Sequence, residues 1–304
     1  MRISTQLIFE TASNRMSDLQ NRLQKTQEQI GSGRRILSPA DDPVAATRAL
    51  DITQSQSINS QYGVNRQYAK NTLGQVEGTL AGVTELMKDV KDAIITAGNG
   101  TLGDSERGFI ATELNGRLQQ LLGLANSRDS AGNYLFSGFQ SNTPAFLQTA
   151  TGATYQGDPG QQKLQVDAFR QMAVSSPGST VFQGGLPPGG ASDVFKTITD
   201  LVNLLNTPGT AGLTAGLATA GANMDSALDN VLTVRASVGS NLQELDALDN
   251  VGTDRDLQYS KVLSELQDLD YTQAVTQLSM QQVALEAAQK SFVKTSGLSL
   301  FNFI

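Results

Sequence analysis

The chain has 304 residues, of which 39% are hydrophobic and only 17% are charged, so it can bury a core of its own. Its formal net charge of −7 disfavours nucleic acid as a partner, because affinity for phosphate backbones depends on clustered Lys and Arg. The absence of Cys and His excludes thiol and imidazole catalysis and ordinary zinc sites. We therefore expect no enzymatic activity and no cofactor, with a carboxylate-only metal site or acid pair as the remaining alternative.

Two kinds of membrane-directed segment are also disfavoured. Residues 1–6 turn polar at once, whereas a secretory signal contains an apolar stretch of roughly 7–15 residues. No apolar run approaches the roughly 18 residues that span a bilayer. We expect no membrane insertion and, for a protein that leaves the cell, export without a cleaved general signal.

Residues 1–30 are predicted to form one amphipathic helix, because seam positions recur at alternating steps of three and four, as in a coiled coil. The predicted seam consists of Phe9, Ala12, Met16, Leu19, Leu23, Thr26 and Ile30. The Gly31-Ser32-Gly33 segment should end this helix. A non-helical connection follows, and Asp41 or Asp42 can then cap the next helix, with Pro43 in its first turn.

The next helix is predicted from Val44 to about Ala97, with Gly63 as a candidate break. Its second half carries an entirely apolar seam of Leu73, Val76, Leu80, Val83, Met87, Val90 and Ile94. Glycines at 74, 78 and 82 recur on an adjoining face, and each costs roughly 1 kcal/mol relative to Ala in a helix. We expect another backbone to approach this stripe closely; the alternative is that these glycines face solvent.

The segment Gly98–Gly103 matches the letters of a dinucleotide-binding glycine motif. That motif requires a preceding strand, whereas here a long helix precedes it. A loop that reverses the chain between antiparallel helices explains the segment better. A further helix should then run from Asp104 or Ser105, either of which can cap it, to about Ser127.

A small β-rich insert is predicted between about Tyr134 and Gly190, where Gly, Pro, Ser and Thr are dense. The expected strands are Thr154-Tyr155, Leu164–Val166, Met172–Val174 and Thr180–Phe182, with turns at Gly157–Gly160 and Pro187–Gly190. Helices are expected again at Ser192–Leu205 and Leu213–Leu248.

The last segment repeats the three-four spacing of the first. Its predicted seam consists of Tyr271, Ala274, Leu278, Gln281, Leu285, Ala288 and Phe292. The predicted fold is mainly α with a small β-rich insert, a long antiparallel helical bundle or coiled coil made by both chain ends. We expect residues 1–44 and 252–304 to be coiled-coil arms, 45–135 and 191–251 the two halves of a helical core, and 136–190 a small β-rich outer domain.

Four segments carry a resemblance to a known family. Ile30–Pro43 is similar to the bacterial flagellin signature, and Leu266–Ala274 to the entry of the flagellin C-terminal helix. Leu298-Ser299-Leu300 and the stretch from Asn126 to Gly138 also resemble that superfamily. The loop residues that carry the match are Gly31, Ser32, Gly33, Arg34, Arg35, Ser38, Asp41, Asp42 and Pro43.

Within the superfamily, the chain resembles the FlgL family of hook–filament junction proteins, also called hook-associated protein type 3. Pro43, the Phe301–Ile304 ending, the length and the compact insert favour this family over filament flagellin, which is the alternative. The resemblance implies a structural subunit of the extracellular flagellum, exported unfolded through the flagellar type III apparatus. It implies a homo-oligomeric ring between the larger hook-associated adaptor and flagellin, an inner tube domain made by the arms, and an export chaperone.

Carboxylate clusters offer the competing enzyme or calcium-site interpretation. The clusters are Asp41/Asp42, Asp246/Asp249 and Asp254/Asp256/Asp268/Asp270. Each has an ordinary explanation as a helix cap or a solvated helix face, and none has the loop spacing of a calcium site. A binding role for the loops of the insert stays open.

Overall fold

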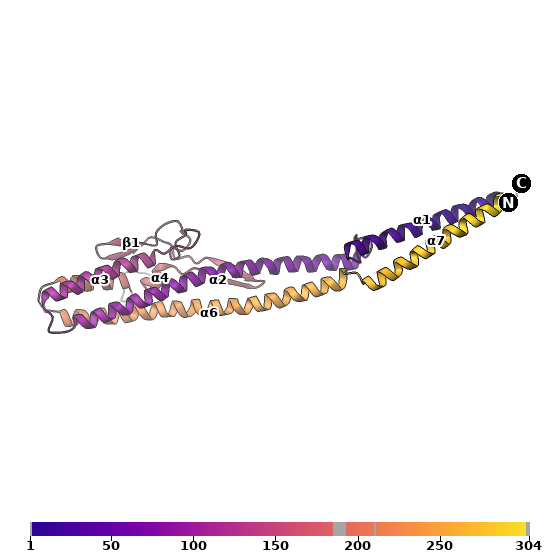
Figure 1. Cartoon of the computed structure of the whole chain (residues 1–304). Coiled ribbons are helices and arrows are strands. Elements are labelled where there is room, and N and C mark those ends of the chain that lie inside the picture. Colours follow the sequence, from indigo (N-terminus) through magenta and orange to yellow (C-terminus); the bar gives the residue numbers. More distant parts are fainter. Residues whose placement is uncertain (1, 185–192, 210, 302–304) are drawn as a thin grey trace. The chain divides into compact units, whose positions relative to one another are not determined.

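The computed structural model describes residues 2–184, 193–209 and 211–301, and it is mainly helical (Figure 1). The helices are α1 (Arg2–Ser32), α2 (Pro43–Ala97), α3 (Asp104–Ala125), α4 (Gly178–Phe182), α5 (Val194–Asn206), α6 (Leu213–Gln267) and α7 (Tyr271–Phe301). The strands are β1 (Phe146–Thr149), β2 (Gly152–Tyr155), β3 (Lys163–Asp167) and β4 (Arg170–Ala173). The predicted fold class, mainly α with a small β-rich insert, is confirmed. The predicted turn at 187–190 and the helix start at 192 lie outside the described residues, as do residues 302–304.

The chain forms two compact units, one of residues 1–58 and 254–304 and the other of residues 59–253. In the first unit, α1 and α7 run side by side (Figure 1). They are antiparallel, because Phe9 lies beside Phe292 while the Leu269 amide donates to the Gly33 carbonyl. The first unit extends to Ile58 along α2, past the residue 44 at which we expected the arm to end.

Local chemistry sets the helix ends of this unit. Gly33 follows α1 with a φ of +71°, a conformation that favours glycine at helix C-termini. The carboxylate of Asp42 accepts the Ala45 amide (3.0 Å) and caps α2, which begins at Pro43. Asp270 caps α7 in the same way, through the Gln273 amide (3.1 Å).

The core of the second unit is built on the apolar seam of α2. All seven residues of the predicted seam are buried: Leu73, Val76, Leu80, Val83, Met87, Val90 and Ile94. Ion pairs between Asp89 and Arg117 (2.9 Å) and between Lys91 and Asp225 (2.5 Å) connect α2 to α3 and α6. The seam therefore faces the neighbouring helices of its own unit.

Two antiparallel hairpins and an aromatic cluster form the insert. Strand β1 pairs with β2, and β3 pairs with β4. The ring of Phe146 lies 4.7 Å from that of Phe195 and 5.6 Å from that of Phe182. Strand β1 was not predicted, and the predicted strand at 180–182 is instead part of α4. A helical turn buries the adjacent side chains Val181 and Phe182 together, whereas a strand would direct them to opposite faces.

Three further expectations about the helices were wrong. Helix α2 continues through Gly63 without a break, because packed residues on both sides, Asn59 and Arg66, override the low helix propensity of glycine. Helix α6 continues to Gln267 rather than ending near Leu248. The N-cap of α3 is Gly103, and no side chain caps it.

The glycine stripe of α2 does not receive another backbone. Gly74, Gly78 and Gly82 are exposed. Atoms outside the local helix lie more than 4 Å from the Cβ positions of Gly74 and Gly78, and the Leu124 side chain is 3.7 Å from that of Gly82. The expected close approach is therefore wrong, and the solvent-facing alternative holds within the subunit.

Gly78→Ala should consequently raise the free energy of unfolding by about 1 kcal/mol, because Ala is favoured over Gly by that amount in a helix interior. Urea denaturation of the purified chain measures the change. Gly78→Leu should not destabilise the subunit either, since open space surrounds this position. Lower stability in both variants would contradict the solvent-facing position of Gly78.

Candidate assembly interface

The α1–α7 pair brings together the seam residues predicted at the two chain ends. The ring of Phe9 lies 5.0 Å from that of Phe292. Thr26 and Ala274 are buried, whereas Phe9 and Tyr271 remain 55% and 54% exposed. The other members are partly exposed: Ala12, Met16, Leu19, Leu23, Ile30, Leu278, Gln281, Leu285, Ala288 and Phe292. A pair of helices covers each seam incompletely, so apolar surface remains for further helices. Whether these residues join copies of the chain stays a prediction.

The outer surface of α7 is apolar beyond the predicted seam. Met280 is 67% exposed and Val283 is 68% exposed. The segment from Tyr271 to Leu285 has no charged residue, so its burial carries no cost of desolvating an ion. Sequence reasoning followed only the seam and missed this face, although the uncharged run was visible in the sequence.

One polar seam position lacks a partner in the pair. Among the described residues, the buried Oε1 of Gln281 has no hydrogen-bond donor. Thr26, the polar seam member of α1, satisfies its hydroxyl by donating to the Arg22 carbonyl (3.0 Å). An unpaired buried acceptor costs about 1–3 kcal/mol. Gln281 therefore lowers the stability of the isolated pair.

The loop between α1 and α2 is organised by Asp41. Its Oδ2 accepts the amides of Leu37 (3.0 Å) and Ser38 (2.9 Å), and its Oδ1 accepts from Lys25 Nζ (2.6 Å). The hydrogen bond from Lys25, followed by that from Ser38, lowers the pKa of Asp41 from 3.8 to about 2. Asp41 thus stabilises the loop by accepting these three hydrogen bonds, and it does not cap α2.

Backbone hydrogen bonds connect this loop to the start of α7. The Arg35 amide donates to the Gln267 carbonyl (2.7 Å), and the Leu269 amide donates to the Gly33 carbonyl (3.1 Å). The guanidinium of Arg35 also donates to the Leu266 carbonyl (2.9 Å). A Cβ on Gly33 would lie 3.0 Å from the Tyr271 hydroxyl. The structure therefore places the flagellin-like segments 30–43 and 266–274, which are far apart in the sequence, side by side and connected by hydrogen bonds.

Lys25→Met should raise the pKa of Asp41 from about 2 toward 3.8, because it removes the largest cause of the shift while both backbone donors remain. An NMR titration of the Asp41 carboxyl carbon measures this. A lowered folded-state pKa stabilises the loop above pH 3.8, and this contribution is lost as the pH falls toward 2. Loop amide exchange in the variant should therefore depend less on pH in this window. An unchanged Asp41 pKa would exclude Lys25 as its cause.

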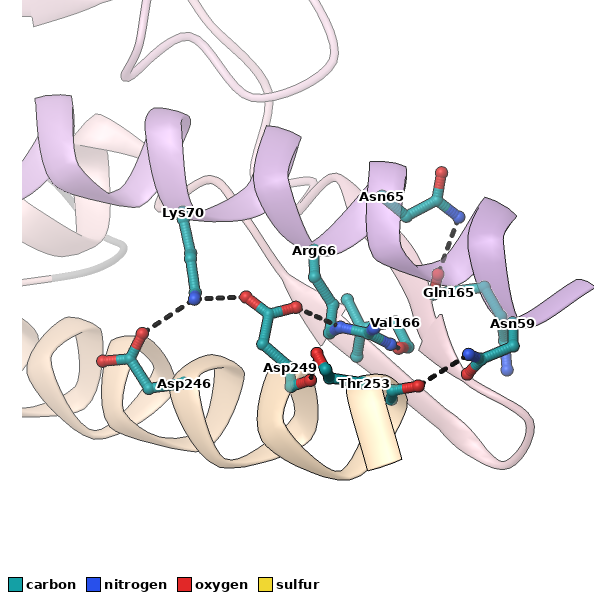
Figure 2. A network of polar contacts seen from close by, with 10 residues as sticks. Asn59, Asn65, Arg66, Lys70, Gln165, Val166, Asp246, Asp249 and Thr253 are labelled. Carbon is teal, nitrogen blue, oxygen red and sulfur yellow. Dashed lines mark hydrogen bonds and ion pairs between the residues drawn. The ribbon is translucent and has the colours of Figure 1, made fainter. Parts of the chain in front are cut away.

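The Asp246/Asp249 cluster belongs to a network that sequence reasoning missed (Figure 2). Arg66 of α2 is only 4% exposed; its Nε donates to Asp249 Oδ1 (2.5 Å) and its Nη1 to the Val166 carbonyl (3.0 Å). Lys70 pairs with both Asp249 and Asp246. Asp249 is therefore a partly buried ion-pair partner, rather than a helix cap or part of a solvated face. Asp246 does lie on a solvated face, as expected, because its side chain is 72% exposed while it pairs with Lys70. A buried Arg in an otherwise polar stretch of α2 left no sequence signal.

The same network holds the β3–β4 hairpin against the helices (Figure 2). Asn65 Nδ2 donates to the Gln165 carbonyl (2.7 Å), and the strand register shifts between Gln165 and Asp167 at the carbonyl that Arg66 binds. Burial alone would raise the pKa of Asp249, but hydrogen bonds from Lys70 and then Arg66 outweigh it and lower that pKa. Asp249 is therefore ionised and paired at neutral pH.

Within residues 2–184, 193–209 and 211–301, no cluster of three or more carboxylates could hold a metal ion. Asp256 accepts from Gln56 (3.0 Å), and Asp268 accepts from Ser264. In the part of the chain that the structure describes, no helix is both long and apolar enough to cross a membrane.

Comparisons with known proteins agree with this architecture. The family model "Bacterial flagellin N-terminal helical region" matches residues 3–141. The flagellar hook-associated protein 3 of Escherichia coli K12 is 36% identical over 316 aligned residues, covering 99% of both chains. The solved hook-associated protein-3 of Legionella pneumophila has a TM-score of 0.64 at 22% identity, covering 71% of this chain and 98% of its own. Flagellin of Listeria monocytogenes is more distant, at 21% identity over 79% of this chain and 85% of its own.

Proposed function

Because the chain belongs to the flagellar hook-associated protein 3 family, we propose that it is a structural subunit of the hook–filament junction. Copies of the chain would form a ring that connects the larger hook-associated adaptor to the flagellin filament. The identity over the full length of the relatives supports this function over filament flagellin, whose similarity is weaker and shorter.

The observation that carries the proposal is the incompletely covered α1–α7 pair. Most of its seam residues are partly exposed, Phe9 and Tyr271 are about half exposed, and α7 adds exposed Met280 and Val283. Burying a Leu or Met side chain completely stabilises an assembly by roughly 1.5–3 kcal/mol. Contacts with neighbouring copies would remove this surface from water, and the arms would then form the inner part of the ring.

A structural rather than catalytic role agrees with the positions of the titratable groups. Asp41 and Asp42 hold a loop and a helix end, and Asp246 and Asp249 pair with Lys70 and Arg66. These roles account for the carboxylates without a substrate. We infer that the protein works through its contacts alone.

Assembly outside the cell requires a route for the chain. We infer that it is exported unfolded through the flagellar type III apparatus and that an export chaperone covers its arms beforehand. The exposed apolar face of α7 supports a chaperone, because such a surface promotes association before assembly.

Immunogold labelling of whole cells with antibodies against this chain tests the proposed position. A single band at the base of each filament is expected for a junction protein. Label along the whole filament would show instead that the chain is a filament flagellin. Label absent from purified hook–filament preparations would reject both functions.

A further inference from the structure

Two Asn-Gly dipeptides occur in the sequence, and they lie in different conformations. Asn99-Gly100 lies in the exposed turn between α2 and α3, and Asn115-Gly116 lies inside α3. In an Asn-Gly pair the glycine nitrogen can attack the preceding amide carbon, because glycine has no Cβ to hinder the approach and adopts many backbone conformations. The two sites therefore allow a comparison within one molecule.

The turn arranges Asn99 for this attack. Its Oδ1 accepts hydrogen bonds from the Thr101 amide (3.2 Å) and the Thr101 hydroxyl (3.0 Å). This Asx-type bond folds the side chain over the peptide that follows it, which brings Cγ toward the Gly100 nitrogen. Gly100 is exposed, and the space around its Cβ position is open to 4 Å. Water and base can reach the reacting atoms.

In the second dipeptide, Asn115-Gly116, the helix keeps the glycine nitrogen away from the asparagine side chain. Gly116 lies in the middle of α3, between Leu114 and Leu118, which are buried at 0% and 4% exposure. In an α-helix the backbone amide points to the carbonyl four residues before it. The Gly116 nitrogen therefore cannot turn toward the Asn115 side chain unless this part of the helix opens.

We propose that Asn99 is a site of spontaneous deamidation. The Gly100 nitrogen loses its proton to base and attacks Asn99 Cγ, so that a bond forms between them. The bond between Cγ and Nδ2 breaks, and the side-chain nitrogen gains a proton and leaves as ammonia. Water then opens the five-membered succinimide at either carbonyl and gives aspartate or isoaspartate. The reaction consumes only water, and no group is oxidised or reduced.

Deamidation of Asn99 would change the turn that precedes α3. A new carboxylate appears close in sequence to Asp104 and Glu106, the acidic residues of the first turn of α3. Isoaspartate in addition lengthens the backbone by one carbon. The turn is closed by two bonds, from the Asn99 amide to the Thr96 carbonyl and from the Leu102 amide to the Asn99 carbonyl (both 3.1 Å). Isoaspartate cannot keep both in their present geometry.

Ageing of the purified full chain at mildly alkaline pH tests the proposal. Peptide mass spectrometry would measure the amide-to-acid mass change at each dipeptide, and isoaspartyl methyltransferase labelling would measure isoaspartate. In the native protein Asn99 should react more than about tenfold faster than Asn115. Asn115 can react only when α3 opens locally, and an opening that costs about 1.4 kcal/mol slows the reaction about tenfold. In urea the two rates should become similar.

Gly100→Ala is the matched variant. Its new methyl group meets open space and Gly100 does not have a positive φ, so the fold should be unchanged while the attack is hindered. Acid formation at residue 99 should then fall close to the native rate of Asn115. Equal native rates at the two dipeptides would overturn the proposal. An Asn99 that is stable when folded but reacts in urea would overturn it as well.

Discussion

A chain that carries Leu278→Asp and Leu285→Asp together is expected to be exported but not to anchor a filament. Both side chains are partly buried in the α1–α7 pair and lie one heptad apart on the same face. The change removes up to roughly 1.5–3 kcal/mol of apolar burial per Leu and adds two carboxylates that the proposed ring would not solvate. Swimming assays should show poor motility, and immunoblots should show flagellin shed into the medium.

The matched control for this variant is Gln282→Asp with Gln289→Asp. These residues have the same spacing on α7 but are exposed, so assembly should be affected much less. The second unit has its own core on the α2 seam, and thermal unfolding should show that it still folds. Normal motility in the Leu variant would reject the seam as an assembly surface. Retention inside the cell would assign the segment to export or chaperone binding.

Arg66→Ala is expected to destabilise the second unit by about 3 kcal/mol, at the low end of the 3–5 kcal/mol measured when one partner of a buried ion pair is removed. The change leaves Asp249 with Lys70 as its remaining ion-pair partner, and it takes a donor from the Val166 carbonyl. Chemical denaturation gives the total effect, and hydrogen exchange should show faster exchange in the β3–β4 hairpin.

Arg170→Ala provides the comparison, because Arg170 also connects this hairpin to a helix. The side chains of its bidentate pair with Glu244 (2.6 and 2.7 Å) are 49% and 37% exposed, so water screens the pair and the loss should be within about 1 kcal/mol. An Arg170 variant as unstable as the Arg66 variant would show that burial does not decide the difference.

Gly252 gives an independent test of the Arg66 position. A Cβ at Gly252 would overlap the guanidinium of Arg66, so Gly252→Ala should destabilise the natural chain. In the Arg66→Ala background the same substitution should stabilise by up to about 1 kcal/mol, since Ala is the better helix residue. A double-mutant cycle measures this reversal of sign. Additive effects would contradict the contact.

The sequence by itself determined the family, the two end helices and the apolar seam of α2, whereas it placed the end of α6 too early. Apolar residues that recur at steps of three and four lie on one face of a helix, and such a face packs against a core. The burial of Leu73 through Ile94 therefore followed directly from the pattern. Helix ends at Gly33 and Pro43 were equally local, because each depends on a backbone property of a single residue. Short apolar segments were ambiguous, as the helical turn at 178–182 shows.

Only the tertiary structure decided which polar residues find partners and which glycines are enclosed. Arg66 and Asp249 are far apart in the sequence, and nothing in their local pattern indicates that they meet under the β3–β4 hairpin. Gly252 and Gly78 both lie in helix interiors, yet the guanidinium of Arg66 packs against Gly252, whereas Gly78 faces open space. Periodicity reports which face of a helix is apolar, whereas the identity of the neighbour depends on how distant segments pack.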